Sequence, residues 1–147
     1  MDKWDQRWMR QAREVSAWSK DPSTKVGAVI VDADKRVVSM GYNGFPAKIA
    51  DYAGDYMDRD TKLKKVVHAE MNAIYNATHN GVSLNGSTLY VWGLPVCSDC
   101  ARGVIQVGIK RVIMNSPSAI ADFGIWKEHW DRSKDMFEEA GVQYDFV

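Results

Sequence analysis

Apolar residues recur at helical spacing in the first part of the chain. They follow three- and four-residue steps among charged residues: Trp4, Trp8, Ala12, Val15 and Trp18. This pattern is typical of one face of an amphipathic helix. Because proline is poorly tolerated inside a helix, the Asp21-Pro22 pair predicts that this helix ends near Lys20.

Two β-branched, apolar stretches come next, at 26–32 and 36–42, with a polar turn at 32–35 between them. Strand-like runs joined by a short polar turn predict a β-hairpin. From 43 to 65 the charges, the aromatics and Gly54 follow no clear period. We expect a long loop there, and loops of this length are often functional.

The rest of the chain alternates between helical and strand patterns. Helices are predicted from His68 to Gly81, over 98–106 and over 125–140; strands are predicted over 87–92, 110–114 and, at a sheet edge, 143–147. A loop is expected at 117–124. The resulting order favours an α/β fold in which helices cover one mixed sheet. A length of 147 residues suits a single domain over 1–147.

The overall charge is balanced, with 19 Lys and Arg residues against 19 Asp and Glu residues. Binders of nucleic acid or anionic membranes usually carry a basic excess, so neither a polynucleotide nor a membrane is an expected partner. The stretch from Met1 to Trp18 lacks the apolar core of a signal peptide, and no later apolar run reaches membrane-spanning length. We therefore expect a cytoplasmic protein.

Candidate chemistry begins with the two cysteines, Cys97 and Cys100, which form a C-x-x-C motif. Without a secretory signal, this pair indicates either a redox dithiol or half of a metal site. His68 and Glu70 open the second predicted helix, as the cysteines open the third. Helix amino termini favour thiolate over thiol, so this arrangement predicts a site with one nitrogen and two sulfur ligands.

One His and two Cys supply three ligands, the number found in a catalytic zinc site that keeps its fourth position for water. Neither His79 nor His129 has a partner at ligand spacing. We expect one Zn²⁺ per chain, held by His68, Cys97 and Cys100. Because zinc lowers the pKa of bound water, Glu70 can take the water proton and return it to the substrate.

The pattern H-x-E followed by P-C-x-x-C is a known signature of zinc deaminases, in which the Glu is not a metal ligand. Here Val96 lies between Pro95 and Cys97, so the turn before the third helix departs from that signature. The ligand spacing itself is unchanged.

Three segments extend the resemblance: Asp21-Pro-Ser-Thr-Lys-Val-Gly-Ala28, Gly41-Tyr-Asn-Gly-Phe-Pro46 and His68-Ala-Glu-Met-Asn-Ala-Ile74. Together they resemble the deoxycytidylate deaminases, which convert dCMP to dUMP, from about the first helix to roughly Met114. The resemblance implies a three-layer α/β/α cytidine deaminase-like fold with a five-stranded mixed sheet. It also implies one catalytic zinc per subunit and a homo-oligomer, often a hexamer.

The resemblance also implies substrate contacts. Asn43 is similar to the family asparagine that meets the deoxyribose and base. Ser23, Thr24 and Lys25 lie in the segment that faces the substrate phosphate. Ala69 is at the position where the family backbone reads the cytosine edge.

Several alternatives stay open from the sequence. The same metal chemistry serves deaminases of free bases or nucleosides, such as cytosine, guanine or cytidine, and a dCMP/dCTP deaminase. A tRNA adenosine deaminase is disfavoured, since the chain has no excess of basic residues that could bind the phosphate backbone of a nucleic acid. A non-catalytic zinc module is disfavoured by Glu70 and by the missing fourth ligand. The resemblance further implies activation by dCTP and inhibition by dTTP. Residues 47–54, however, lack the glycine-rich, acidic sequence associated with effector binding, so we expect weak or absent activation by dCTP.

Overall fold

The computed structural model describes residues 2–120 and 123–147 of the chain. Its elements are, in chain order, α1 (Lys3–Ser16), β1 (Gly27–Val31), β2 (Val37–Tyr42), α2 (Ala53–Met57), α3 (Arg59–Lys65), α4 (Ala69–His79), β3 (Thr88–Trp92), α5 (Ser98–Gln106), β4 (Arg111–Met114), a 3-10 turn (Pro117–Ala119), α6 (Phe123–Ala140) and β5 (Gln143–Phe146).

The strands form one five-stranded mixed sheet in the order β2-β1-β3-β4-β5. β1 is antiparallel to both of its neighbours, with Gly27 opposite Tyr42 on β2 and opposite Trp92 on β3. β3, β4 and β5 run parallel to one another. The amino end of β1 therefore lies at the same edge of the sheet as the carboxyl ends of the other four strands.

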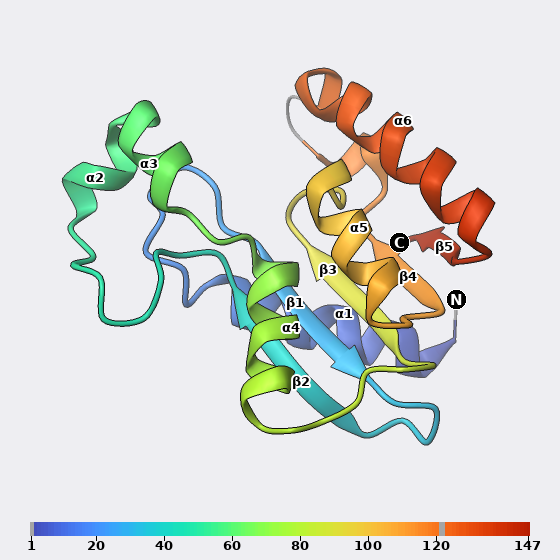
Figure 1. Cartoon of the computed structure of the whole chain (residues 1–147). Coiled ribbons are helices and arrows are strands. Elements are labelled where there is room, and N and C mark those ends of the chain that lie inside the picture. The colour runs from blue at the N-terminus through green and yellow to red at the C-terminus, as the bar shows by residue number, and fades with distance from the viewer. Residues whose placement is uncertain (1, 121–122) are drawn as a thin grey trace.

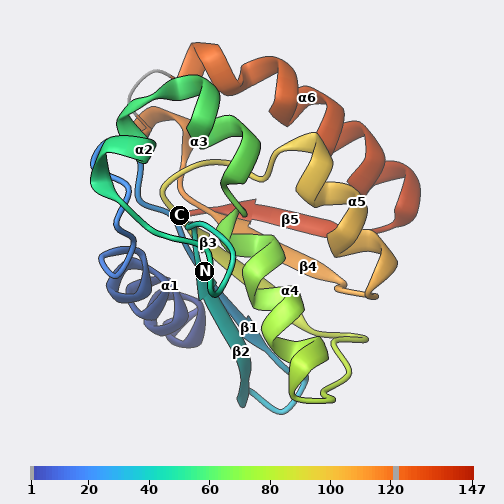
Figure 2. The ribbon, with the colours of Figure 1, turned by 60° about the vertical axis from the view of Figure 1, so that its left-hand side comes forward.

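Helices cover both faces of the sheet, as the two views in Figure 1 and Figure 2 show. α1 packs on one face, where it contacts β1 and β3, while α4 and α5 lie on the opposite face and α6 packs against α5. Alternate strand residues follow this division: Val29 and Val31 pack with α1, whereas Ala28 and Ile30 face α4. The three-layer α/β/α architecture predicted from the sequence is confirmed.

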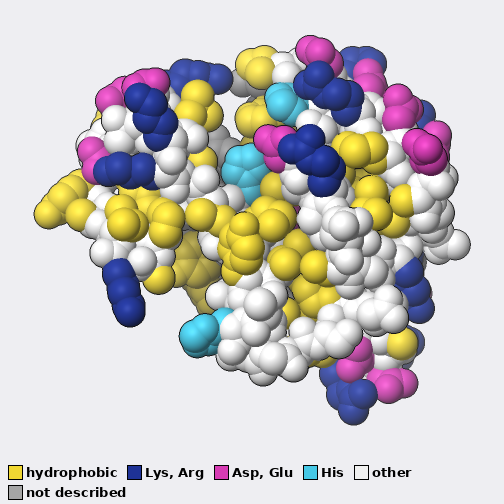
Figure 3. Space-filling view, viewed as in Figure 1, with side chains coloured by type: hydrophobic (Ala, Val, Ile, Leu, Met, Phe, Trp, Pro, Cys, Tyr) yellow, Lys and Arg dark blue, Asp and Glu magenta, His cyan; other side chains and the backbone are white. Residues whose placement is uncertain are grey.

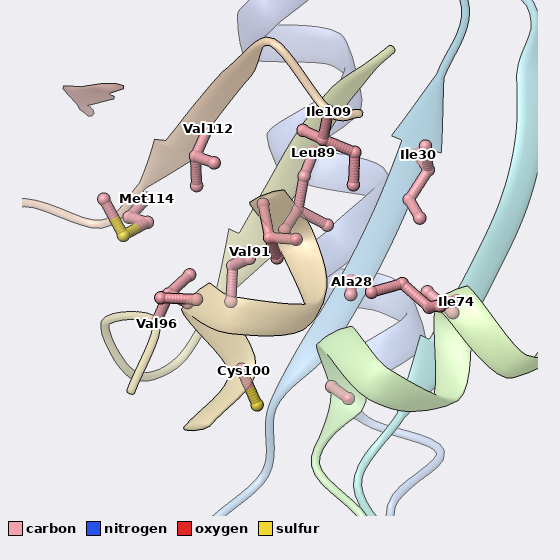
Figure 4. Packing of buried hydrophobic residues seen from close by; sticks show 14 of the residues in the cluster. Ala28, Ile30, Ile74, Leu89, Val91, Val96, Cys100, Ile109, Val112 and Met114 are labelled. Atoms are coloured by element: carbon pink, nitrogen blue, oxygen red, sulfur yellow. The ribbon is translucent and has the colours of Figure 1, made fainter. Parts of the chain in front are cut away.

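The larger core fills the space between the sheet and α4, α5 and α6. Figure 4 shows Val91, Val112 and Met114 from β3 and β4 together with Val96, which precedes α5. Val96, the residue inserted into the signature, is fully buried there. Its side chain thus belongs to the packing that supports α5.

Two glycines let helices approach the sheet closely. A Cβ on Gly27 would lie 2.0 Å from the Ala12 carbonyl oxygen of α1, and one on Gly41 would lie 2.5 Å from the Ala73 nitrogen of α4. Such distances are far shorter than van der Waals contact, so only glycine fits at either position. α1 and α4 are thereby held close to the sheet from opposite sides.

The segment predicted as a loop from 43 to 65 contains two short helices, α2 and α3, which Figure 1 shows beside the layered body of the fold. α3 has no buried side chain, so its sequence carries no apolar period that could have indicated a helix. α1 ends at Ser16, earlier than the predicted Lys20, and Trp18 lies outside the helix with about half of its surface exposed. Trp18 packs edge-on against Tyr42 instead.

The hairpin and the other predicted helices and strands occur within a few residues of their expected bounds. The predicted loop at 117–124 begins with the 3-10 turn and includes residues 121 and 122, which lie outside the described residues. Across the described ranges, none of the helices combines the length and apolar character needed to cross a bilayer.

Candidate active site

The chemistry-bearing residues gather at one end of the sheet. The loops that follow β2 and β3 meet there with the segment that precedes β1, and a backbone bridge between Gly44 and Val67 joins the first of these loops to the start of α4. Ligands of open α/β sheets commonly bind at the carboxyl ends of the strands. The fold therefore places the His68 and Cys97 motifs where a substrate site is expected.

His68, Cys97 and Cys100 form a compact group of potential metal ligands. The Nδ1 atom of His68 lies 3.4 Å from the Cys97 Sγ and 3.3 Å from the Cys100 Sγ. A tetrahedral zinc with typical Zn–N and Zn–S bonds would separate such atoms by about 3.6 Å. All three ligand atoms lie within 4.8 Å of one another, so the group fits one zinc ion.

Two helix starts present these ligands. α4 begins directly after His68, and α5 begins directly after Cys97, whose sulfur accepts a hydrogen bond from the Cys100 N–H at 3.5 Å. Hydrogen bonds from the Cys100 side chain and from His68 lower the pKa of Cys97 to about 4. Next to that thiolate, the pKa of the Cys100 thiol is raised, so a second thiolate there requires a cation such as a metal ion.

Glu70 lies in the first turn of α4 and is 4% exposed. Burial raises the pKa of its carboxyl group, and the nearby His68 opposes that rise. A carboxyl group whose pKa is moved toward neutrality can both take up and release a proton near pH 7. The described site therefore combines a metal-ligand group with a candidate proton carrier.

Asn43, the residue expected to meet the sugar and base, is buried and bound to the backbone. Its Oδ1 accepts a hydrogen bond from the Val26 N–H at 2.9 Å, and its Nδ2 donates to the Thr24 carbonyl at 2.8 Å. The Ser19 hydroxyl donates to the Asn43 carbonyl at 2.8 Å. Asn43 therefore organises the segment that leads into β1, whatever further contact it makes.

The three residues expected at the phosphate lie on the turn before β1. The Ser23 hydroxyl donates to Asp21 Oδ1 at 3.0 Å, and the Thr24 N–H donates to the same oxygen at 3.1 Å. The exposed Lys25 side chain donates from its ammonium to the Ser19 carbonyl. Lys25 is thus bound to the backbone at Ser19, and its exposure leaves the side chain room to move.

Ala69 is fully buried between His68 and Glu70. Its carbonyl oxygen would lie 2.9 Å from a Cβ on Gly41, so β2 passes directly beside the first turn of α4.

Sequence reasoning missed two features close to these segments. The first is the ion pair between Asp21 and Lys62, with Oδ2 and Nζ 2.6 Å apart. The second is the stack of Phe45 on Tyr56, with ring centroids 4.0 Å apart. Asp-Pro-Ser-Thr is a turn signal that could have indicated the role of Asp21, but no local pattern marks Lys62 or Tyr56.

The surface is hollowed beside the start of α5. Figure 3 shows this hollow between the α2–α3 segment and α6, with histidine side chains at its border. A pocket of about 510 Å³ on the α5–α6 side is lined by Ser98, Asp99, Arg102, His129, Arg132 and Met136. The pocket lies beside the metal-ligand group, at the start of α5, and its lining does not include His68, Glu70, Cys97 or Cys100.

Comparisons with known proteins agree with this site. The family model of the cytidine and deoxycytidylate deaminase zinc-binding region matches residues 2–116. A deaminase in the luxG 3′ region of Aliivibrio fischeri is 42% identical over 148 residues, which cover 100% of this chain and 95% of that protein. The deoxycytidylate deaminase of Mus musculus is 40% identical over 146 residues, covering 96% and 78%.

Among solved structures, the dCMP deaminase of the cyanophage S-TIM5 in apo form superimposes with a TM-score of 0.76. It is 23% identical, and the match covers 100% of both chains. This likeness confirms the fold class. Because the family model spans most of the chain, including the segments that carry His68, Cys97 and Cys100, this protein belongs to the zinc-binding cytidine and deoxycytidylate deaminase family.

Proposed function

We propose that the protein deaminates dCMP by zinc-dependent hydrolysis, giving dUMP and ammonia. The observation that carries the proposal is the group of His68, Cys97 and Cys100 with the buried Glu70 beside it, at the starts of two adjacent helices. The choice of dCMP is supported by the Mus musculus relative, a deoxycytidylate deaminase. It is further supported by the S-TIM5 enzyme, whose structure in complex with dCMP and dUMP shares the fold.

In the proposed mechanism His68, Cys97 and Cys100 hold the zinc. When bound, zinc lowers the pKa of a water molecule toward neutrality and so supplies a hydroxide nucleophile. Glu70 would accept one proton of the attacking water and deliver it to N3 of the cytosine ring, and would then carry the second proton of that water to the amino group, which leaves as ammonia. Burial raises the pKa of Glu70, which suits it to both halves of this transfer.

Recognition of the nucleotide is assigned to the neighbouring segments. We assign the deoxyribose and base to Asn43, the cytosine edge to the backbone at Ala69, and the phosphate to Ser23, Thr24 and Lys25. Lys25 would leave the Ser19 carbonyl to reach the phosphate, which its exposed side chain permits. A local phosphate site is required, because the chain has no net positive charge.

A substrate screen tests this proposal. Purified enzyme is assayed for ammonia release from dCMP, dCTP, deoxycytidine, cytosine and guanine, with a preparation stripped of zinc by a chelator as the control. We expect the highest kcat/KM for dCMP and no turnover without the metal. A preference for deoxycytidine, cytosine or guanine would assign the same chemistry to a nucleoside or base, and comparable rates with dCTP would indicate a dCMP/dCTP deaminase.

We also propose that the chain assembles into a homo-oligomer, with a hexamer expected from the family resemblance. Large apolar side chains are exposed in and around the α2–α3 segment, among them Tyr52, Met57 and Leu63. Figure 3 shows hydrophobic side chains gathered across this side of the molecule. Contiguous apolar surface of this kind often marks a protein interface. Sedimentation equilibrium measures the mass directly, and a monomer at micromolar concentration would contradict the proposal.

A further inference from the structure

We propose that the ion pair between Asp21 and Lys62 positions the turn 21–25 for a substrate phosphate and offsets the negative charge of Asp21 there. This inference rests on the proposed dCMP specificity and adds Lys62 as a positioning residue. Lys62 acts through Asp21 and is not assigned a contact with the substrate.

Asp21 is the organising side chain of the turn. It is fully buried, and its Oδ1 accepts hydrogen bonds from the Ser23 N–H at 2.9 Å, the Ser23 hydroxyl at 3.0 Å and the Thr24 N–H at 3.1 Å. Its Oδ2 lies 2.6 Å from the Lys62 ammonium, which is also 3.4 Å from the Ser23 Oγ. Lys62 thus meets both the carboxylate and one of the residues that the carboxylate holds.

The charge of Asp21 is the reason that the turn needs a cation. Burial raises the pKa of Asp21, but the Lys62 ammonium and the Ser23 and Thr24 N–H groups outweigh that effect, and the pKa is lowered overall. Asp21 is therefore ionised at neutral pH. A phosphate dianion that approaches Ser23 and Thr24 would be repelled by this buried carboxylate if nothing compensated it, since like charges interact strongly where water is excluded.

Lys62 is the cation best placed to supply that compensation. The Lys20 ammonium pairs with Asp51 at 3.1 Å, and the Lys25 ammonium binds the Ser19 carbonyl. The side chain of Lys62 is only 20% exposed, against 66% for Lys20. Its interaction with Asp21 is accordingly less screened by solvent and salt.

The location of Lys62 also argues for a role at the turn. It belongs to α3, a helix with no buried residue, so the helix gains little from packing its own side chains. The pair joins α3 to a segment 41 positions earlier in the chain, the one that Asn43 also binds. Replacing a buried ion pair by apolar residues is often neutral or stabilising, so the stability of the fold alone does not account for this pair.

The test compares Lys62→Met, Lys62→Arg and the double variant Asp21→Asn/Lys62→Met with wild type, on dCMP and on deoxycytidine. The matched control is Lys64→Met, since Lys64 lies on the same helix and forms a largely exposed pair with Asp60. We expect Lys62→Met to raise KM for dCMP by about ten- to a hundredfold, with kcat and the deoxycytidine rate within about threefold of wild type. Lys62→Arg and Lys64→Met should resemble wild type.

The double variant separates positioning from direct phosphate contact. The asparagine that it carries in place of Asp21 can still accept the hydrogen bonds of Ser23 and Thr24 through its amide oxygen, and the site has lost both charges together. We therefore expect the double variant to recover most of the dCMP affinity lost in Lys62→Met. If Lys62 contacted the phosphate itself, removal of the Asp21 charge would restore little, and this inference would be wrong.

Other outcomes are equally decisive. An equal loss for dCMP and deoxycytidine in Lys62→Met would mean that the pair is merely structural. Circular dichroism and zinc content show whether Lys62→Met folds. If it does not fold, the double variant is tested instead. A double variant that still prefers dCMP over deoxycytidine supports the inference, and one that has lost this preference overturns it. The wild-type rates are measured first and test the proposed function by themselves. Turnover of deoxycytidine or cytosine without turnover of dCMP would refute that function before any variant is compared.

Discussion

Glu70 combines deep burial with a position in the first turn of α4, next to the ligand His68. Glu70→Gln keeps the size of the side chain and removes its ability to carry a proton. We expect this variant to retain about one zinc per chain while its turnover falls by about 10²- to 10⁴-fold. Metal analysis and ammonia release on the same preparation measure both quantities. Near-normal turnover would assign Glu70 a structural role.

Lys25 offers a second residue-scale prediction. Lys25→Ala removes an ammonium that we assign to the phosphate, so kcat/KM for dCMP should fall by about ten- to a hundredfold. Deoxycytidine has no phosphate, and its rate should not change. Rates for the two substrates are compared in wild type and variant; an equal fall in both would show that Lys25 serves the fold through its bond to the Ser19 carbonyl.

Local spacing explains which of these residues could be predicted from the sequence. His68 and Glu70 are two positions apart and Cys97 and Cys100 three apart, so each pair was recognisable within one helix start. The 2.6 Å pair of Asp21 and Lys62 joins positions with no shared motif. Only the path of the α2–α3 segment brings them together, and no periodic pattern in the sequence describes that path.

At the scale of elements, the distance between β2 and α4 matters because α4 carries Glu70 in its first turn. A Cβ on Gly41 would lie 2.5 Å from the Ala73 nitrogen and 2.9 Å from the Ala69 carbonyl oxygen. Gly41→Ala should therefore force α4 outward, at a cost of about 1–3 kcal/mol in the free energy of unfolding. Because His68 precedes α4, activity should fall as well.

Gly54→Ala is the matched control for this prediction, since a Cβ there would meet no heavy atom within 4 Å. Gly54 lies in α2, where alanine is the better helix former, so that change should be neutral or slightly stabilising. Urea denaturation of both variants measures the difference. Equal stabilities of Gly41→Ala and wild type would show that the sheet and α4 can separate without cost.

The elements that bury an apolar face were predictable, because burial imposes a period on the sequence. α1, with Met9, Ala12 and Val15 buried, is one such element, although its end was placed four residues too late. Trp18 continued the apolar spacing but packs against Tyr42 from outside the helix. α2 and α3 are five and seven residues long, and between them only Tyr56 is buried, which is too little for a period.

For the whole molecule, we predict weak or absent activation by dCTP. Residues 47–54 lack the glycine-rich, acidic sequence associated with effector binding, and the side chain of Ile49 among them is about half exposed. Rates as a function of dCMP concentration should follow a hyperbola both with and without dCTP. A sigmoidal curve that becomes hyperbolic on addition of dCTP would contradict the prediction, and dTTP serves as the companion test for inhibition.

The order of the strands is a property of the whole molecule that the sequence did not disclose. Alternation predicted one mixed sheet, and the sheet is confirmed as mixed. Long-range pairing places β3 between β1 and β4. It also brings the carboxyl ends of the other four strands to the edge of the sheet where β1 begins. This arrangement is nevertheless what brings the turn before β1 to the His68 and Cys97 motifs.

The bridge between Gly44 and Val67 has a consequence for how such a protein can diverge. The two residues exchange backbone hydrogen bonds of 3.1 and 2.8 Å, and so close the base of the segment that contains α2 and α3. Insertions or deletions beyond that closure can change the length of the segment without moving His68. Descendants of one ancestor could thus acquire different α2–α3 segments, and with them different substrates, around an unaltered metal centre, provided that each segment still delivers a cation to Asp21.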